Sequence, residues 1–200
     1  MQRPKKRLPA EERKKQILKS AVTVFAKSNY RSAKVVDIAD EVAISEAMVY
    51  KYFPTKKSIF LAILAHMSAR IIAFWKEEVK KEPDALTALK KMGLVYYERM
   101  KEHPNELKVQ FQAISEIDDE DIARQLRKDH LKYIGFINSV LKKGVRQGIV
   151  KQNLNTEELS FLMNGGGIVL NMMQLLSFDI TSFKTNPELL LDHFIEMIRA

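Results

Sequence analysis

The chain has 200 residues, of which 46% are hydrophobic and 29% are charged, a composition typical of a soluble globular protein and unlike that of a disordered one. It contains no cysteine, which excludes disulfide scaffolds, thiolate metal sites and cysteine nucleophiles. The formal net charge is +8, and residues 1–57 carry all of it, because residues 58–200 hold equal numbers of basic and acidic side chains. This asymmetry indicates a polyanionic partner. Nucleic acid is the first candidate and an anionic membrane surface the second, with a solvated basic tail as the alternative.

The sequence predicts neither a signal peptide nor a membrane span. Residues 1–9 are basic, but further charged residues follow them instead of an apolar segment. The longest apolar stretches are interrupted by polar side chains such as His66, Arg70 and Asn171. We therefore expect a cytoplasmic protein that does not bind a membrane.

Apolar residues recur at helical spacing along the chain, and no stretch has the alternation and turn that mark a hairpin. The prolines lie between the periodic stretches, where helices begin, and no glycine precedes Gly93. This pattern predicts an all-α fold of about nine helices. The predicted helices cover residues 9–27, 34–42, 45–53, 55–81, 84–103, 104–116, 119–147, 156–178 and 186–200.

The second and third helices are short and consecutive, with a turn of two or three residues at Ala43 and Ile44 between them. This arrangement is typical of a helix-turn-helix unit, whose second helix enters the major groove of DNA. We expect Ser45 to cap that helix. A helical wheel places Val49 and Phe53 on its inner side with Ser45 and Tyr52. The residues expected to face outward are Ala47, Met48, Tyr50 and Lys51.

Two further groups of cations surround this unit. Lys56 and Lys57 stand at the start of the fourth helix, where free backbone N–H groups and an ammonium can bind one phosphate. The alternative is a solvated pair of surface lysines. The basic arm of residues 3–7 could follow a phosphate backbone or lie in a minor groove, or it could be a tail without a partner.

Short motifs follow one another at fixed spacing through the first third of the chain: Ile17–Phe25, Asn29–Tyr30, Val35–Ala39, Ile44–Ser45, Val49–Phe53 and Thr55–Ile59. In their order and spacing, residues 13–64 resemble the DNA-binding domain of TetR-type transcriptional regulators. The resemblance implies an N-terminal three-helix helix-turn-helix DNA-binding domain in residues 1–55, which includes the basic arm. It also implies a C-terminal helical domain for ligand binding and dimerisation in residues 56–200.

The sequence departs from the family pattern at several positions. Asn29 and Ala43 stand where glycine is usual, and a left-handed Ala43 costs about 1 kcal/mol. Lys34 replaces a hydroxyl residue, so we expect it to contact phosphate through its charge. Glu46 can accept a hydrogen bond from cytosine N4. The residues to which we assign DNA contacts are Lys34, Ser45, Glu46, Ala47, Met48, Tyr50, Lys51, Tyr52 and Lys56.

The resemblance also implies an apolar effector cavity and a two-fold dimer interface built on the last two helices, which are apolar nearly all round. The predicted cavity residues are Trp75, Tyr96, Met100, Phe111, Ile114, Tyr133, Ile137 and Asn164. The predicted interface residues are Phe161, Gly165, Gly166, Val169, Met173, Leu190, Phe194 and Met197. Close approach of a partner helix would explain Gly165–Gly167, and a flexible kink or a helix break near Gly167 is the alternative.

Enzymatic chemistry is not expected. The four histidines lie far apart in sequence, without metal-ligand spacing, and the acidic run Asp118–Asp121 suits the first turn of a helix. We therefore predict no catalytic residues, no metal and no cofactor.

These observations lead to one hypothesis and two competitors. The chain is predicted to be a homodimeric, ligand-responsive, sequence-specific DNA-binding repressor, released from a palindromic operator by a small apolar or amphipathic effector. One competitor is a peripheral helical protein that binds anionic membranes. The other is a small α-helical enzyme, which would require a histidine or carboxylate cluster that the sequence does not show. A transcriptional activator of the same fold is a variant of the main hypothesis.

Overall fold

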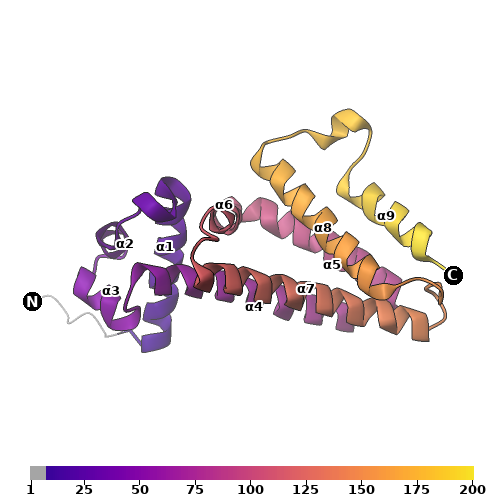
Figure 1. The fold of residues 1–200 in the computed structure, drawn as a ribbon, viewed down its shortest axis with the longest axis horizontal. Helices are drawn as coiled ribbons and strands as arrows, with labels where there is room; N and C mark the ends of the chain where they lie inside the picture. The colour runs from indigo at the N-terminus through magenta and orange to yellow at the C-terminus, as the bar shows by residue number, and fades with distance from the viewer. Residues whose placement is uncertain (1–7) are drawn as a thin grey trace, which may run out of the picture.

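The computed structural model describes residues 8–200, except for the side chains of Ser182 and Phe183. The basic arm of residues 3–7 therefore lies outside the described residues. The helices are α1 (Ala10–Ser32), α2 (Val35–Glu41), α3 (Glu46–Tyr52), α4 (Lys56–Lys81), α5 (Ala85–Glu102), α6 (Pro104–Ile114), α7 (Glu120–Arg146), α8 (Thr156–Leu175), the short 3-10 helix η1 (Ile180–Phe183) and α9 (Pro187–Ile198) (Figure 1). Within residues 8–200 the only β structure is an isolated bridge between Val150 and Arg199, so the predicted all-α class is confirmed.

The helix ends follow from local hydrogen bonds. The Ser45 hydroxyl accepts a hydrogen bond from the Met48 N–H at 3.2 Å, and the Thr55 hydroxyl accepts one from the Ser58 N–H at 3.0 Å. The Asn186 side chain accepts from the Leu189 N–H at 2.9 Å. Each of these bonds satisfies one of the backbone donors that a helix start leaves free, which fixes where α3, α4 and α9 begin.

Two details of the predicted helices are resolved by the structure. The helical backbone of α1 is interrupted at Asn29 (φ 61°, ψ 170°), close to the predicted helix end at residue 27, and a short further helical stretch reaches Ser32. The Asn29 side-chain oxygen accepts a hydrogen bond from the Ser32 N–H at 3.0 Å, which holds the chain through this bend. α8 runs without interruption through Gly165–Gly167, so the alternative of a helix break near Gly167 is excluded.

The N-terminal head consists of α1–α3 and the first turns of α4, packed around a single core (Figure 1). Phe25 of α1 lies at its centre, with its ring edge-on to Phe60 at 5.3 Å between centroids. Val49 anchors α3 in the same core. The core continues into α6 and α7 through Val109 and Ile122, so the head is packed directly onto the rest of the chain.

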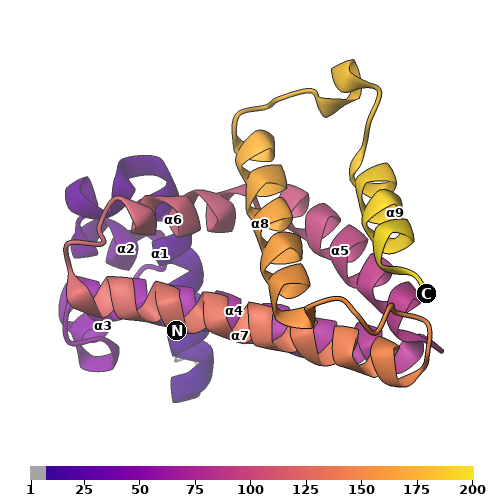
Figure 2. The same ribbon diagram turned by 45° about the vertical axis from the view of Figure 1, so that its right-hand side comes forward.

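The remaining helices form an elongated body. α4 and α7 lie side by side along its length, and α5 packs against both (Figures 1 and 2). A second core fills this body, and it includes Trp75, Leu89, Ile137 and Leu141. α8 packs against α7 and α5, whereas α9 packs against α5, with the segment that contains η1 joining the two (Figure 2).

By length and hydropathy alone, α4 could cross a membrane, and it is the only helix of the described residues that passes this test. The expectation from sequence that no stretch is apolar enough therefore does not hold for α4. Its apolar side chains, such as Ile63, Met67 and Ile71, are buried against α1, α5 and α7. This burial is what a central core helix requires.

Candidate DNA-binding surface and effector cavity

The α2–α3 connection is a tight turn stabilised by backbone hydrogen bonds. The N–H of Ala43 donates to the Asp40 carbonyl at 3.0 Å, and that of Ile44 donates to the Ala39 carbonyl at 3.1 Å. Ala43 has a φ of 52°, the left-handed conformation anticipated for this position. The turn therefore sets α3 at a fixed angle to α2, as a helix-turn-helix unit requires.

The two sides of α3 differ as the helical wheel predicts, except that Ser45, which was expected on the inner side, is exposed because it caps the helix. Val49 is fully buried in the head, and Phe53 is buried just beyond the helix end. The residues on the opposite side are exposed to solvent, namely Glu46, Ala47, Met48, Tyr50 and Lys51. α3 therefore presents one continuous surface away from the head.

Three of the assigned residues have additional or different roles. The Ser45 hydroxyl caps α3, and Tyr52 is half-buried against the core of the head. Partial desolvation and the nearby Glu46 carboxylate raise the pKa of the exposed Tyr50, so its phenol stays protonated and can donate a hydrogen bond. Lys34 is exposed directly before α2, where its backbone N–H donates to the Asp37 carboxylate at 3.4 Å.

The lysine pair at the start of α4 is held by contacts within the chain. The Lys56 ammonium donates to the carbonyls of Arg31 and Ala33 at 3.0 and 3.1 Å and lies 4.9 Å from the Tyr30 ring centroid. The Lys57 ammonium forms ion pairs with Asp119 and Asp121 of the body. Lys56 thus ties α4 to the end of α1, a role that the sequence analysis missed.

The body contains a cavity of about 370 Å³ between α8 and α9, with α4, α5 and α7 forming its floor. Five of the predicted residues line it: Trp75, Tyr96, Tyr133, Ile137 and Asn164. Met100 and Phe111 lie outside it, and Ile114 is 50% exposed on the surface of α6, so these three predictions are wrong. The apolar periodicity of α5 and α6 predicts which residues face inward, but it does not predict which of them border the cavity.

Other cavity residues were not anticipated. Asn171 of α8 is almost fully buried, and its amide donates to the Tyr96 hydroxyl at 2.8 Å. Gly93 of α5 faces α9, where a Cβ atom would lie 2.8 Å from the Leu191 side chain. Gly93 therefore permits the close packing of α5 and α9 at the cavity wall.

The comparisons with known proteins agree with this arrangement. Residues 17–63, which include the whole helix-turn-helix unit, match the family described as "Bacterial regulatory proteins, tetR family". The match therefore identifies a TetR-type DNA-binding domain in residues 17–63.

Several relatives of this chain are described as HTH-type transcriptional regulators. It is 29% identical over 174 residues to the uncharacterized HTH-type transcriptional regulator YuxN of Bacillus subtilis, and the match covers 85% of this chain and 58% of that protein. Two solved structures share its fold: FadR of Bacillus subtilis in complex with stearoyl-CoA, with a TM-score of 0.76 at 18% identity, and a regulator of Saccharomonospora viridis in complex with choline, with a TM-score of 0.79 at 22% identity. The matches cover 92% and 95% of this chain and 96% and 99% of those chains.

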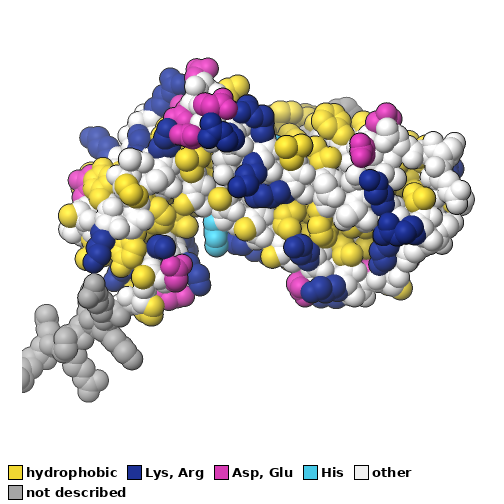
Figure 3. Space-filling model, turned by 60° about the horizontal axis from the view of Figure 1, so that its bottom comes forward, with side chains coloured by type: hydrophobic (Ala, Val, Ile, Leu, Met, Phe, Trp, Pro, Cys, Tyr) yellow, Lys and Arg dark blue, Asp and Glu magenta, His cyan; other side chains and the backbone are white. Residues whose placement is uncertain are grey.

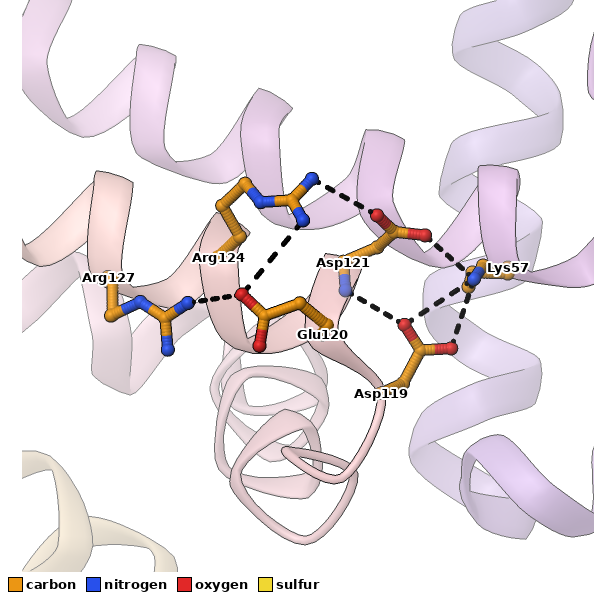
Figure 4. Close-up of polar contacts among 6 residues, drawn as sticks. All are labelled: Lys57, Asp119, Glu120, Asp121, Arg124 and Arg127. Atoms are coloured by element: carbon orange, nitrogen blue, oxygen red, sulfur yellow. Dashed lines mark hydrogen bonds and ion pairs between the residues drawn. The ribbon is translucent and has the colours of Figure 1, made fainter.

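Ion pairs join the head to the body (Figure 4). Lys57 of α4 reaches the Asp119 and Asp121 carboxylates at the start of α7, at 3.1 and 2.8 Å. The hydrogen bonds that the Lys57 ammonium donates to Asp121 and Asp119 raise the pKa of Lys57, and the bond to Asp119 lowers the pKa of that carboxyl. Arg31 at the end of α1 pairs with Glu116 at 3.0 Å. The connection between α6 and α7 is thus attached to the head at two points.

A hollow separates the head from the body on the face seen in Figure 3. A groove of about 390 Å³ lies where α1 and α4 meet the α5–α6 connection, and its lining includes Lys15, His66 and Arg70. Arg70 of α4 forms a two-pronged ion pair with Glu106 of α6 at 2.8 and 2.9 Å. This pair links α4 to α6 beside the groove.

The predicted interface residues lie on the outer side of the body. Phe161 is 65% and Met197 is 52% exposed, and Gly166, Val169 and Leu190 are also exposed. Gly165, Met173 and Phe194 are half-buried. Gly166, Val169, Leu190 and Phe194 also line the cavity, so the cavity opens onto this apolar face. A Cβ atom at Gly165 or Gly166 would meet nothing within 4 Å in this chain.

Acidic and histidine side chains do not gather anywhere as a candidate metal site. Within residues 8–200 no three His, Asp or Glu side chains come close enough to hold an ion. The acidic run at residues 118–121 is instead used by the cations of α4 and α7 (Figure 4).

Proposed function

We propose that this chain is a ligand-responsive, sequence-specific DNA-binding regulator of the cytoplasm, and specifically a repressor that a small effector releases from a palindromic operator. The observation that carries the proposal is the position of α4. Its first turn is tied to the head by Lys56, and its second half contributes Ile71 and Trp75 to the cavity. One rigid helix therefore connects the surface that reads DNA with the site that accepts a ligand.

The DNA contacts would come from α3 and from the cations around it. With Glu46, Ala47, Met48, Tyr50 and Lys51 exposed on one side, α3 can enter a major groove without a steric barrier from the head. The Tyr50 phenol can donate to a base or a phosphate, and Glu46 can accept from cytosine N4. The exposed Lys34 and Lys51 would contact phosphates on either side of the groove. Lys56 would act mainly by holding α4 against α1.

A palindromic operator requires two copies of the head at a fixed separation of about 34–36 Å. We propose that α8 and α9 pack against the same helices of a second chain. Their exposed apolar side chains support this, because monomeric soluble proteins rarely expose a contiguous apolar surface of this kind. The open space next to Gly165 and Gly166 would allow a partner helix to approach closely.

The switch would act through the separation of the two heads. A ligand between α8, α9 and α4 would favour a dimer whose α4 helices hold the heads at the wrong spacing. Such coupling needs a ligand that binds the two dimer states with different affinity, typically by about 1–3 kcal/mol. FadR and the Saccharomonospora viridis regulator, which share this fold, are described in complex with stearoyl-CoA and with choline. These complexes support a ligand site in the body, and our chain's own ligand is considered below.

The test is a mobility-shift titration with the DNA that flanks the protein's own gene. We expect a shift at about 50 mM salt, and an affinity that falls steeply as the salt concentration rises. Tyr50→Ala should weaken binding, and Lys51→Ala should also reduce the slope of log affinity against log salt by about 1. The matched control is Lys76→Ala, which removes an exposed lysine of α4 far from α3. Absence of a shift, or equal effects of Lys51→Ala and Lys76→Ala, would contradict the proposal. A transcription assay with the same DNA then separates repression from activation.

A further inference from the structure

The cavity wall lacks ionised groups. Among its described lining residues there is no Asp, Glu, Lys or Arg, and the polar members are tyrosines, amides and His130. Burial lowers the pKa of His130, and its ring contacts the Asn164 amide at 3.5 Å. A charged ligand would therefore lose its water without gaining an opposite charge, which is strongly unfavourable.

The aromatic rings do not form a cage for a cation. Trp75 touches Tyr96 and Tyr133 edge-on, with ring centroids 5.8 and 5.7 Å apart, and it stacks on Phe136 at 6.0 Å. These are the separations of rings in direct contact. A quaternary ammonium would have to sit between the rings, where the rings already occupy the space.

Three residues of this wall, Trp75, Gln110 and Asn171, each have a buried polar atom without a hydrogen-bond partner, and Trp75 and Asn171 lie next to each other around Tyr96. Trp75 is 7% exposed and Asn171 is 3% exposed, and neither the Trp75 Nε1–H nor the Asn171 Oδ1 has a hydrogen-bond partner in the structure. Turning the Asn171 amide by 180° would exchange its oxygen and nitrogen and still leave one of them unpaired. An unmade hydrogen bond at a buried group is costly, so a ligand that supplies it gains affinity. Both residues contact Tyr96, so they lie in the same part of the wall.

From these observations we propose that the effector is an uncharged, mainly apolar molecule that carries one hydrogen-bonding group, such as a hydroxyl or a primary amide. This group accepts a hydrogen bond from the Trp75 Nε1–H and forms a second hydrogen bond with the Asn171 amide. This inference rests on the proposed function, because it specifies the ligand of the same cavity. Fatty carboxylates and quaternary ammonium compounds are excluded as effectors by the same reasoning. The hydrocarbon part of the ligand would lie among the apolar side chains of α8 and α9.

Four eight-carbon probes test the inference on the full chain: 1-octanol, octane, octanoate and octyltrimethylammonium. Trp75 is the only tryptophan of the chain, so its fluorescence emission reports occupation of the cavity directly. We expect 1-octanol to bind tightest, with octanoate and octyltrimethylammonium at least about tenfold weaker. Equal or tighter binding of either ion, or an unchanged Trp75 emission with all four probes, would overturn the proposal.

Variants test the polar contacts separately from the shape of the cavity. Asn171→Leu should weaken 1-octanol about threefold to tenfold and leave octane within about twofold. Trp75→Phe should also weaken binding of 1-octanol and leave that of octane nearly unchanged. Calorimetry measures this variant, because it lacks the tryptophan whose fluorescence reports binding. Asn153→Leu, at an exposed asparagine outside the cavity, is the matched control. Equal losses for octane and 1-octanol would assign Asn171 a structural role only and overturn the inference. The mobility shift without any probe is scored independently, so failure to bind DNA is distinguishable from failure of the ligand assignment.

Discussion

The head and the body of this molecule bury their apolar side chains to different extents. In the head, the large apolar residues Ile17, Phe25 and Phe60 are fully buried, and the aromatic rings contact one another. In the body, α8 and α9 leave Phe161, Leu190 and Met197 exposed, and the cavity between these helices opens onto the same face. A single chain buries the large apolar side chains of the head, whereas it leaves apolar side chains on the outer side of the body exposed to solvent.

This difference shows which part of the molecule depends on partners. A fully packed head can keep α3 in a fixed orientation without help from another molecule. An apolar face next to an unfilled cavity, by contrast, gains stability when a second chain or a ligand covers it. The predictions below test this contrast, from the largest expected effect to the smallest.

Phe25→Ala should destabilise the fold most. The ring lies at the centre of the head core, and removal of a buried phenylalanine typically costs about 3–5 kcal/mol. Urea unfolding followed by circular dichroism measures this loss. Leu131→Ala, at a residue of α7 that is 69% exposed, is the control and should stay within about 0.5 kcal/mol of the unchanged protein. Similar losses for both variants would show that the head core is not the better-packed region.

Phe161→Glu should weaken self-association at least about tenfold, because a charge would be buried in the proposed interface. The fold of the single chain should survive, since Phe161 is mostly exposed. Sedimentation equilibrium over a range of concentrations measures the change. Leu131→Glu introduces the same charge on α7 and should leave the association state unaltered. A protein that remains monomeric at every concentration would disprove the proposed interface.

Asp119→Asn should loosen the attachment of the head to the body at low salt. It removes one of the two carboxylates that pair with Lys57, and exposed ion pairs are weak and screened by salt. We expect the midpoint of thermal unfolding to fall by less than about 3 °C at low salt and to be unchanged at high salt. Glu120→Gln, on the same turn of α7 but without a contact to Lys57, serves for comparison. A loss that persists at high salt would point to a different cause.

The smallest effect concerns pH. Burial lowers the pKa of His130 below its ordinary value of 6.5, so the unfolded chain takes up the proton at a higher pH than the folded chain. The folded state therefore gains the full stabilisation from neutral His130 above pH 6.5. This stabilisation is lost as the pH falls from 6.5 through the lower pKa of the folded state. His130→Asn should flatten the dependence of unfolding free energy between pH 7.5 and 5.5, measured by urea titration, whereas His193→Asn on the exposed side of α9 should not. Identical curves for the two variants would contradict this.

Local sequence signals predicted the head well. The cap at Ser45, the left-handed Ala43 and the buried Val49 all follow from residue chemistry within a few positions. The contacts of Lys56 and Lys57 could not be predicted from neighbouring residues, because their partners lie 23 to 64 residues away along the chain. A lysine at a helix start looks the same in sequence whether it faces a phosphate or a carbonyl.

The cavity was predicted only in part for a related reason. Helical periodicity marks Met100 and Phe111 as apolar positions, but only the packing of several helices decides which of these positions border an empty space. Asn171 appeared in sequence as one polar residue that interrupts an apolar helix. Its importance became visible only with Tyr96 and Trp75 beside it.

The contact of Gly93 with Leu191 makes position 93 a control point for the width of the cavity. A methyl group there would lie 2.8 Å from the Leu191 Cδ atoms, so a larger residue requires Leu191 to turn away or α9 to move, and either change reshapes the cavity wall without altering its polar atoms. One substitution at position 93 can thereby change which effectors fit, while the surface of α3 stays the same.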